Sequence, residues 1–203
     1  MAAAYELIQA GHDVTLLEAR ARPGGRVLTF RSPFREDQYG DAGAARIHTS
    51  HNWTVAYLRL FALRTVPFYP TKFQFIRLSR GKRIALDRSR YAYVAGLYLG
   101  LNLSNPDEWF RIDGGNDQLS RAFASQLTNN IIYNAPVTRI EQHAPGVGAT
   151  FVKNGIKRQL SGDYLICTVP FSTLRDVEVI PPFSLQGALA SGYRVARNVN
   201  EAS

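Results

Sequence analysis

The feature that most restricts the fold of this chain is the order of its first predicted elements. Ala2 to Ala10 is rich in helix formers, and Gly11 can end the helix because glycine readily adopts a left-handed backbone conformation. The next residues, DVTLLEA, are apolar in the middle, which is typical of a strand buried on both faces, and the strand ends at Glu18. The sequence therefore predicts a helix, a turn and a buried strand with an acid at its end.

An acid in that place is characteristic of dinucleotide-binding proteins. In a βαβ unit, the carboxylate at the end of the second strand accepts hydrogen bonds from the ribose hydroxyls of adenosine. The glycine-rich turn that opens the unit lies about 20 residues before that acid. Counted back from Glu18, this spacing places the turn before Met1, so we expect the first strand and its glycines to be missing. The alternative for Glu18 is a merely solvated acid.

A glycine pair next to an arginine follows the strand. Gly24 and Gly25 have no Cβ atoms, so their backbone can adopt positive φ and approach a ligand closely. Arg26 offers a fixed cation for a pyrophosphate group. The alternative for the glycine pair is an ordinary turn after Pro23. If the glycine pair approaches a ligand, the strand and the turn together bind a nucleotide.

Composition and charge narrow the class of protein. The chain has 203 residues, 45% hydrophobic and 20% charged, which suits one full-sized domain or two small ones. The formal net charge is +8, but Lys and Arg are scattered, which favours a solubility charge and an anionic ligand over nucleic-acid binding. The single cysteine, Cys167, excludes an internal disulfide. The apolar run Asp163 to Val169 predicts a strand that returns to a parallel sheet and buries this thiol as an inert group.

Targeting and membrane signals are absent from the sequence. The start, MAAAYELIQAGHD, has no basic region ahead of an apolar run, so we expect no secretory signal. The most apolar window, residues 91–103, is too short to span a bilayer and contains two glycines. We therefore expect no membrane segment and, by default, a cytoplasmic location.

Residues 2–29, AAAYELIQAGHDVTLLEARARPGGRVLT, resemble the N-terminal segment of flavin-dependent amine oxidases. This group holds the L-amino-acid oxidases, monoamine oxidases and polyamine oxidases. In the family, a strand and a G-x-G-x-x-G turn run directly into such a segment. The resemblance implies an α/β fold: a Rossmann-like FAD-binding domain, here without its first strand, with part of an α+β substrate domain.

The resemblance also implies FAD as the cofactor and assigns residues to it. The segment DQYGDAGAARIH, residues 37–48, is similar to the family segment that runs beside the isoalloxazine ring. In the amino-acid oxidase branch, the arginine at the position of Arg46 also holds the substrate carboxylate. The alternative for Arg46 is a surface cation. The residues that the resemblance assigns to the cofactor are Glu18, Ala19, Gly25, Arg26, Gly43, Ala44, Ala45, Arg46 and, through its backbone at the adenine, Val137.

Local patterns predict the remaining elements. Residues 52–63 have helical periodicity, and LSRGKRIAL has a glycine-containing turn that is typical of a hairpin. A helix to about Leu127 follows the turn at residues 113–116, with Asn116 or Asp117 able to cap it. Two short strands are expected in residues 129–142, and Asn154-Gly155 predicts a tight hairpin.

Together with these patterns, the resemblance implies four parts. Residues 1–64 are the first part of the FAD-binding domain, and residues 65–110 are a partial substrate domain. Residues 111–183 are the second part of the FAD-binding domain and include a β-meander, and residues 184–203 begin a return to the substrate domain or form a disordered tail.

The resemblance implies oxidative deamination of an amine or L-amino acid to an imine or keto product, with hydrogen peroxide. The partners would be that small molecule and dioxygen, with a homodimer as a further option. No catalytic residue and no metal ligand is predicted. Two interpretations stay open: the chain is an incomplete product of an oxidase gene, or it is a non-catalytic remnant that binds an adenine nucleotide or a protein.

Overall fold

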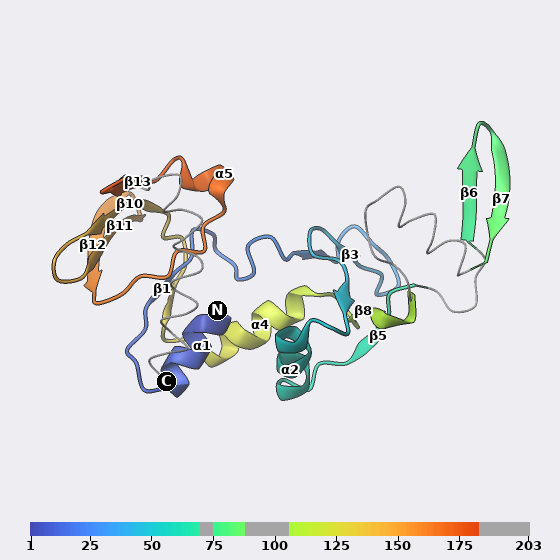
Figure 1. The fold of residues 1–203 in the computed structure, drawn as a ribbon, viewed down its shortest axis with the longest axis horizontal. Coiled ribbons are helices and arrows are strands. Elements are labelled where there is room, and N and C mark those ends of the chain that lie inside the picture. Colours follow the sequence, from blue (N-terminus) through green and yellow to red (C-terminus); the bar gives the residue numbers. More distant parts are fainter. Residues whose placement is uncertain (70–74, 88–105, 183–203) are drawn as a thin grey trace. The chain divides into compact units, whose positions relative to one another are not determined.

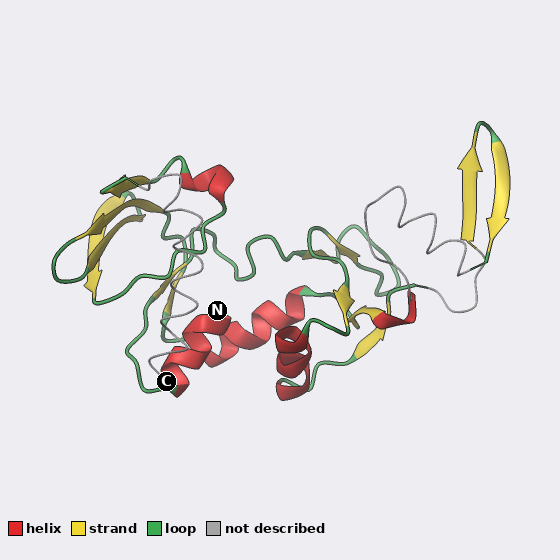
Figure 2. Ribbon diagram, viewed as in Figure 1, coloured by secondary structure: helices red, strands yellow, loops and turns green. Residues whose placement is uncertain are grey.

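The computed structural model describes residues 1–69, 75–87 and 106–182 (Figure 1). The chain divides into two compact units, which are described separately. Unit 1 comprises Met1–Gln9 and Pro23–Thr128, and unit 2 comprises Ala10–Arg22 and Asn129–Ser203. The predictions made for the apolar window 91–103 and for the tail 184–203 lie outside the described residues. Both units contain helices and strands, so the fold is of the mixed α/β type (Figure 2).

Three helices of unit 1 share an aromatic cluster. They are α1 (Ala2–Gln9), α2 (Asn52–Leu60) and α4 (Asp117–Gln126). The Phe123 ring of α4 lies 5.8 Å from that of Tyr5, 4.8 Å from that of Tyr57 and 5.0 Å from that of Phe61, each edge to face. Edge-to-face rings contribute attraction beyond their buried area, so this cluster fixes the helices to one another. The predicted helices at residues 2–10, 52–63 and up to Leu127 are confirmed.

Short antiparallel strands complete the core of unit 1. Ile47, Leu58 and Ile112 form a buried apolar cluster between α2 and a three-stranded sheet of order β4-β8-β5. A separate pair, β2-β3, lies beside the start of α4 through hydrogen bonds described below. The bounds are β2 Thr29–Phe30, β3 Gly40–Asp41, β4 Ile47–His48, β5 Thr65–Pro67, the 3-10 helix η1 Pro106–Glu108 and β8 Trp109–Ile112.

The hairpin predicted in LSRGKRIAL is confirmed. It consists of β6 (Phe75–Ser79) and β7 (Lys82–Leu86), with Ser79 paired to Lys82. Arg80 and Gly81 both have positive φ, +48° and +74°, which is the backbone that a two-residue hairpin turn requires.

Unit 2 contains a parallel strand pair and a four-stranded sheet. In the pair, β1 (Leu16–Leu17) lies parallel to β9 (Ile131–Ile132). The sheet has the order β12-β11-β10-β13, and Asn154 and Gly155 form the predicted tight turn between β11 and β12, with φ of +52° and +76°. The bounds are β10 Val137–Gln142, β11 Val147–Lys153, β12 Ile156–Gly162, α5 Phe171–Leu174 and β13 Glu178–Ile180.

Three expectations about strands and burial are wrong. The first strand is not buried on both faces: Leu16 and Leu17 are half-buried, and β9 is the partner of β1 within the described residues. Residues 163–169 form no strand, because no described segment pairs with their backbone. Cys167 is consequently exposed rather than buried. An apolar run becomes a central strand only where neighbours on both sides complete its hydrogen bonds.

The start of α4 differs from the capping prediction. Asn116 occupies the N-cap position, but its side chain makes no capping hydrogen bond to the helix. The Thr29 hydroxyl, from β2, instead accepts a hydrogen bond of 3.2 Å from the Asp117 N–H.

Within the described ranges, no helix has the length and apolar character needed to cross a bilayer.

Candidate cofactor and substrate site

In unit 2, Glu18 follows β1 and is tied to the segment after β9. The Glu18 N–H donates to the carbonyl of Ile132 at 3.0 Å, and the Ala135 N–H donates to the carbonyl of Glu18 at 2.9 Å. One carboxylate oxygen, Oε1, accepts a hydrogen bond from the Arg20 N–H at 2.8 Å. Among the described residues, Oε2 has no protein partner, and the side chain is half-buried. The carboxylate therefore keeps acceptor capacity for a ligand.

The same unit brings Val137 near that strand. Val137 begins β10, two residues after Ala135, and pairs with Phe151 of β11. Ala19, next to Glu18, is exposed. Tyr133 lies in the intervening segment, and burial together with the nearby charge of Glu18 raises the pKa of its phenol. Unit 2 thus places Glu18, Ala19 and Val137 on adjoining segments.

In unit 1, Gly24 and Gly25 form a tight turn before β2. The Val27 N–H donates to the carbonyl of Gly24 at 2.7 Å. Gly24 has a φ of +95°, and a Cβ there would lie 2.9 Å from the hydroxyl of Ser120 on α4. Gly25 has a φ of +50°, and a Cβ there would meet no atom within 4 Å. The turn therefore packs on α4 at one glycine and leaves the other accessible to a ligand.

The second predicted segment lies against this turn. Gly43 has a φ of +125°, and a Cβ on it would lie 1.9 Å from the carbonyl oxygen of Arg26. The Ala42 N–H also donates to the carbonyl of Leu28 at 2.7 Å. Unit 1 thus brings Gly25 and Arg26 together with the segment 43–46, although the two are separate in the sequence. Arg26 is exposed, and within the described part of the chain no acid pairs with it.

Arg46 is held by two aromatic side chains. Its Nη1 donates a hydrogen bond of 2.7 Å to the hydroxyl of Tyr69, which is only 5% exposed. Its guanidinium carbon lies 5.1 Å from the ring centroid of Trp109, a cation–π distance. Arg46 itself is half-buried, and across residues 1–69, 75–87 and 106–182 no acidic side chain pairs with it. Its remaining N–H groups can donate hydrogen bonds to an anionic ligand.

Sequence reasoning missed Tyr69 and Trp109. Both lie in an aromatic-rich region from which no pocket residue could be selected, because aromatic residues most often form core. Trp109 also contacts His48, with ring centroids 4.8 Å apart. The His48 Nε2 lies 3.0 Å from the Glu108 Oε2, and its Nδ1 lies 2.7 Å from the Ser50 hydroxyl oxygen. These contacts of His48 restrain the Trp109 ring, against which the Arg46 guanidinium lies.

A network of charged side chains links the end of β2 to the start of α4. Asp117, 6% exposed, pairs with Arg31 at 2.7 Å and with Arg121 at 2.8 Å. Burial alone would raise the pKa of Asp117, but the Arg31 hydrogen bond and the charge of Arg121 outweigh it and lower that pKa. The hydrogen bond to Asp117 likewise raises the pKa of Arg31. The pair is therefore ionised at neutral pH and anchors β2 to the start of α4.

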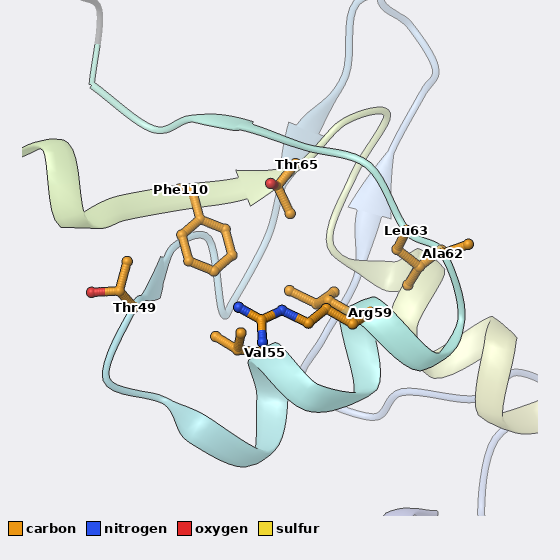
Figure 3. Close-up of a pocket in the computed structure, with 8 residues that line it drawn as sticks. Thr49, Val55, Arg59, Ala62, Leu63, Thr65 and Phe110 are labelled. Atoms are coloured by element: carbon orange, nitrogen blue, oxygen red, sulfur yellow. The ribbon is translucent and has the colours of Figure 1, made fainter.

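The hollow beside α2 is a different feature. It measures about 430 Å³, and Val55, Leu63 and Phe110 supply apolar walls. Figure 3 shows the Arg59 side chain extending from α2 across this hollow toward Phe110. None of the predicted cofactor residues lines it. We therefore do not assign the cofactor to this hollow.

Each unit offers groups that suit one part of a flavin dinucleotide. Unit 2 offers a half-buried carboxylate that can accept hydrogen bonds from a diol. Unit 1 offers two arginines that have no acidic partner among the described residues, and glycine and alanine backbone against which a flat ring can lie. Taken one unit at a time, the residues therefore fit parts of that group.

The fold is of the mixed α/β type, and comparison with known proteins identifies the family of the chain. The family described as "Flavin containing amine oxidoreductase" matches residues 1–94 and 72–193. The chain belongs to the flavin-containing amine oxidoreductase family.

Two curated relatives are L-amino-acid oxidases by name. The putative L-amino-acid oxidase YobN of Bacillus subtilis (strain 168) is 27% identical over 86% of this chain and 54% of that protein. L-amino acid oxidase Cdc18 of Crotalus durissus cumanensis is 44% identical over 69 residues, which are 34% of this chain and 13% of that protein. The chain spans about half the length of the Bacillus protein.

Solved structures agree on the fold. Wild-type putrescine oxidase bound to putrescine superposes with a TM-score of 0.72 at 17% identity, over 92% of this chain and 59% of that one. Cyclohexylamine oxidase from Brevibacterium oxydans IH-35A gives a TM-score of 0.72 at 15% identity, over 94% and 60%. At these identities the likeness establishes the shared fold.

Proposed function

We propose that the chain binds FAD and contributes to the oxidation of an amino acid. The single observation that carries this proposal is Arg46, a half-buried arginine that two aromatic residues hold and that has no acidic partner among the described residues. Partial burial of a cation without a counterion costs free energy, so an anionic ligand at this position would offset that desolvation. The carboxylate of an amino acid is such a ligand.

The cofactor proposal divides along the two units. In unit 2, Glu18 would bind the ribose hydroxyls, with Ala19 beside it and the Val137 backbone at the adenine. In unit 1, Arg26 would bind the pyrophosphate, and the backbone of Gly25 and residues 43–45 would lie against the ring. The assignment of residues 1–64 and 111–183 to the FAD-binding domain, and of 65–110 to the substrate domain, stays a prediction.

Arg46 would position the substrate. FAD, when bound, would accept the hydride that leaves the carbon bearing the amine, and dioxygen would then accept two electrons from the reduced cofactor and become hydrogen peroxide. With Nη1 donating to Tyr69, the other edge of the guanidinium can bind a carboxylate with two parallel hydrogen bonds. The Trp109 ring covers one face of the guanidinium and limits the access of water, which strengthens the ion pair.

A substrate comparison tests this proposal. Peroxide production is measured with L-amino acids and with the amines that correspond to them without the carboxylate, in wild type, Arg46→Met and the control Arg59→Met. We expect Arg46→Met to abolish the preference for amino acids and Arg59→Met to keep it. A wild-type chain that prefers the amines, or an Arg46→Met variant that retains the preference, would contradict the assignment of Arg46.

A further inference from the structure

Three segments of unit 1 meet at Asn116. This residue is only 4% exposed and its polar groups are all bonded. Its N–H donates to the Asp41 Oδ1 at 3.0 Å, and its Oδ1 accepts from the Ile112 N–H at 2.9 Å. Its Nδ2 donates to the carbonyl oxygen of Ala44 at 2.9 Å. Asn116 therefore joins the turn before α4 both to β3 and to the segment that follows it.

The surroundings of Asn116 leave it little freedom. Gly115 has a φ of +117°, and a Cβ there would lie 2.3 Å from the Thr29 methyl carbon. The Thr29 hydroxyl donates to the Asp41 Oδ1 at 2.6 Å and accepts from the Asp117 N–H at 3.2 Å. The turn is thus pressed against β2 and bonded on both sides, so Asn116 presents its amide to Ala44 in a fixed position.

The hydrogen bond to Ala44 has a consequence for the next residue. The peptide between Ala44 and Ala45 is trans, and a trans peptide directs its C=O and its N–H to opposite sides. Because the Ala44 carbonyl points toward Asn116, the Ala45 N–H points away from it. Ala45 is half-buried, and within the described part of the chain its N–H has no protein partner. A main-chain donor is therefore presented on the face opposite α4.

We propose that Asn116 is a positioning residue for the cofactor: it sets the orientation of the Ala44–Ala45 peptide so that the Ala45 N–H donates to the polar edge of the flavin. This inference rests on the proposed function and adds to it a residue that itself has no contact with the ligand. The carboxamide is required because it combines, in one planar group, the acceptor for Ile112 and the donor for Ala44.

A matched pair of isosteric variants isolates the donor. Asn116→Asp keeps the acceptor for Ile112, but at pH 8 its carboxylate cannot donate to Ala44 and repels that carbonyl. Gln118→Glu makes the same change at the same turn, where the amide donates to the carbonyls of Gly115, at 3.1 Å, and Asp113. It leaves Ala44 untouched.

FAD affinity and amide exchange are both measured on the full chain. FAD titration followed by flavin fluorescence should give a Kd about tenfold higher for Asn116→Asp than for wild type, and about twofold at most for Gln118→Glu. Without FAD, hydrogen exchange should be about tenfold faster in Asn116→Asp at the Ala42 amide and in β4, and unchanged there in Gln118→Glu.

The outcomes separate the two proposals. Wild type that binds FAD, with Asn116→Asp equal to Gln118→Glu in both measurements, overturns the positioning role alone. Wild type that binds no FAD overturns the proposed function, and the positioning role with it. If Asn116→Asp does not fold, NMR of wild type decides: slow exchange of the Asn116 side-chain amide relative to that of exposed Asn52 supports the role, and equal exchange overturns it.

Discussion

The backbone of Gly43 lies directly against the carbonyl of Arg26, so closely that a Cβ on Gly43 would lie 1.9 Å from that oxygen. This contact joins the glycine–arginine turn to the segment that carries Arg46. The two halves of the proposed ring-binding surface meet at this contact, so it limits how far apart they lie. Glycine is the residue that permits both the approach and the positive φ of +125°.

Gly43→Ala should therefore destabilise unit 1 by about 3 kcal/mol and reduce FAD affinity, since clash and backbone strain add. Urea unfolding gives the free energy, and FAD titration gives the affinity. Gly81→Ala is the matched control: it also has a positive φ, of +74°, but a Cβ there would meet no atom within 4 Å. The Gly81→Ala variant should lose about 1 kcal/mol of unfolding free energy. Equal losses at the two glycines would show that the contact with Arg26 contributes nothing.

Tyr69→Phe should raise KM for an amino acid about tenfold and leave kcat nearly unchanged. The variant removes one hydrogen bond to a charged group, which is worth about 1.5 kcal/mol or more, and leaves the guanidinium free to turn. Steady-state peroxide assays measure both constants. Tyr39→Phe is the control, because the Tyr39 hydroxyl contacts the carbonyl of Ile112 and not Arg46. A Tyr69→Phe variant that behaves like Tyr39→Phe would remove Tyr69 from the site.

The free energy of unfolding should fall at high pH, because Tyr57 loses its proton there. Burial, together with the hydrogen bond to Glu6, raises the pKa of Tyr57 from 10.0 to about 12. The folded chain therefore holds this proton more tightly than the unfolded chain does, so the contribution is fully present below pH 10 and is lost as the pH rises toward 12. Urea unfolding of wild type and Tyr57→Phe between these values tests it. The variant should lose less stability over that range, and parallel curves would contradict the expected pKa.

The sequence predicted well the features that depend on neighbouring residues. The α1 helix, the turn at Arg80 and Gly81 and the turn at Asn154 and Gly155 follow from local propensity, and all three are present. The strand expected at residues 163–169 failed because apolar character does not supply a pairing partner. The expected burial of Cys167 was wrong for the same reason, since a thiol is buried only where a sheet and its covering elements enclose that thiol.

The residues of the candidate site also differ in whether the sequence alone could reveal them. Glu18 and Arg26 could be selected because they lie at a strand end and beside a glycine pair, and Arg46 could be selected from the resemblance to the family. Tyr69 could not be selected, because its contact with Arg46 joins positions 23 residues apart in a region rich in aromatic residues. The bond from Asn116 to Ala44 spans 72 residues, and the sequence pattern at Asn116 indicated a helix cap instead. Such long-range contacts require the packed structure.

The central claim is that the Glu18 carboxylate helps to bind the adenosine end of FAD, and a single titration tests it most directly. FAD is added to wild type, to Glu18→Ala and to Asp163→Ala, which removes an exposed carboxylate from the same unit. We expect wild type and Asp163→Ala to bind FAD alike and the Kd of Glu18→Ala to rise at least about tenfold. Equal binding by all three proteins, or no binding by wild type, would contradict the account.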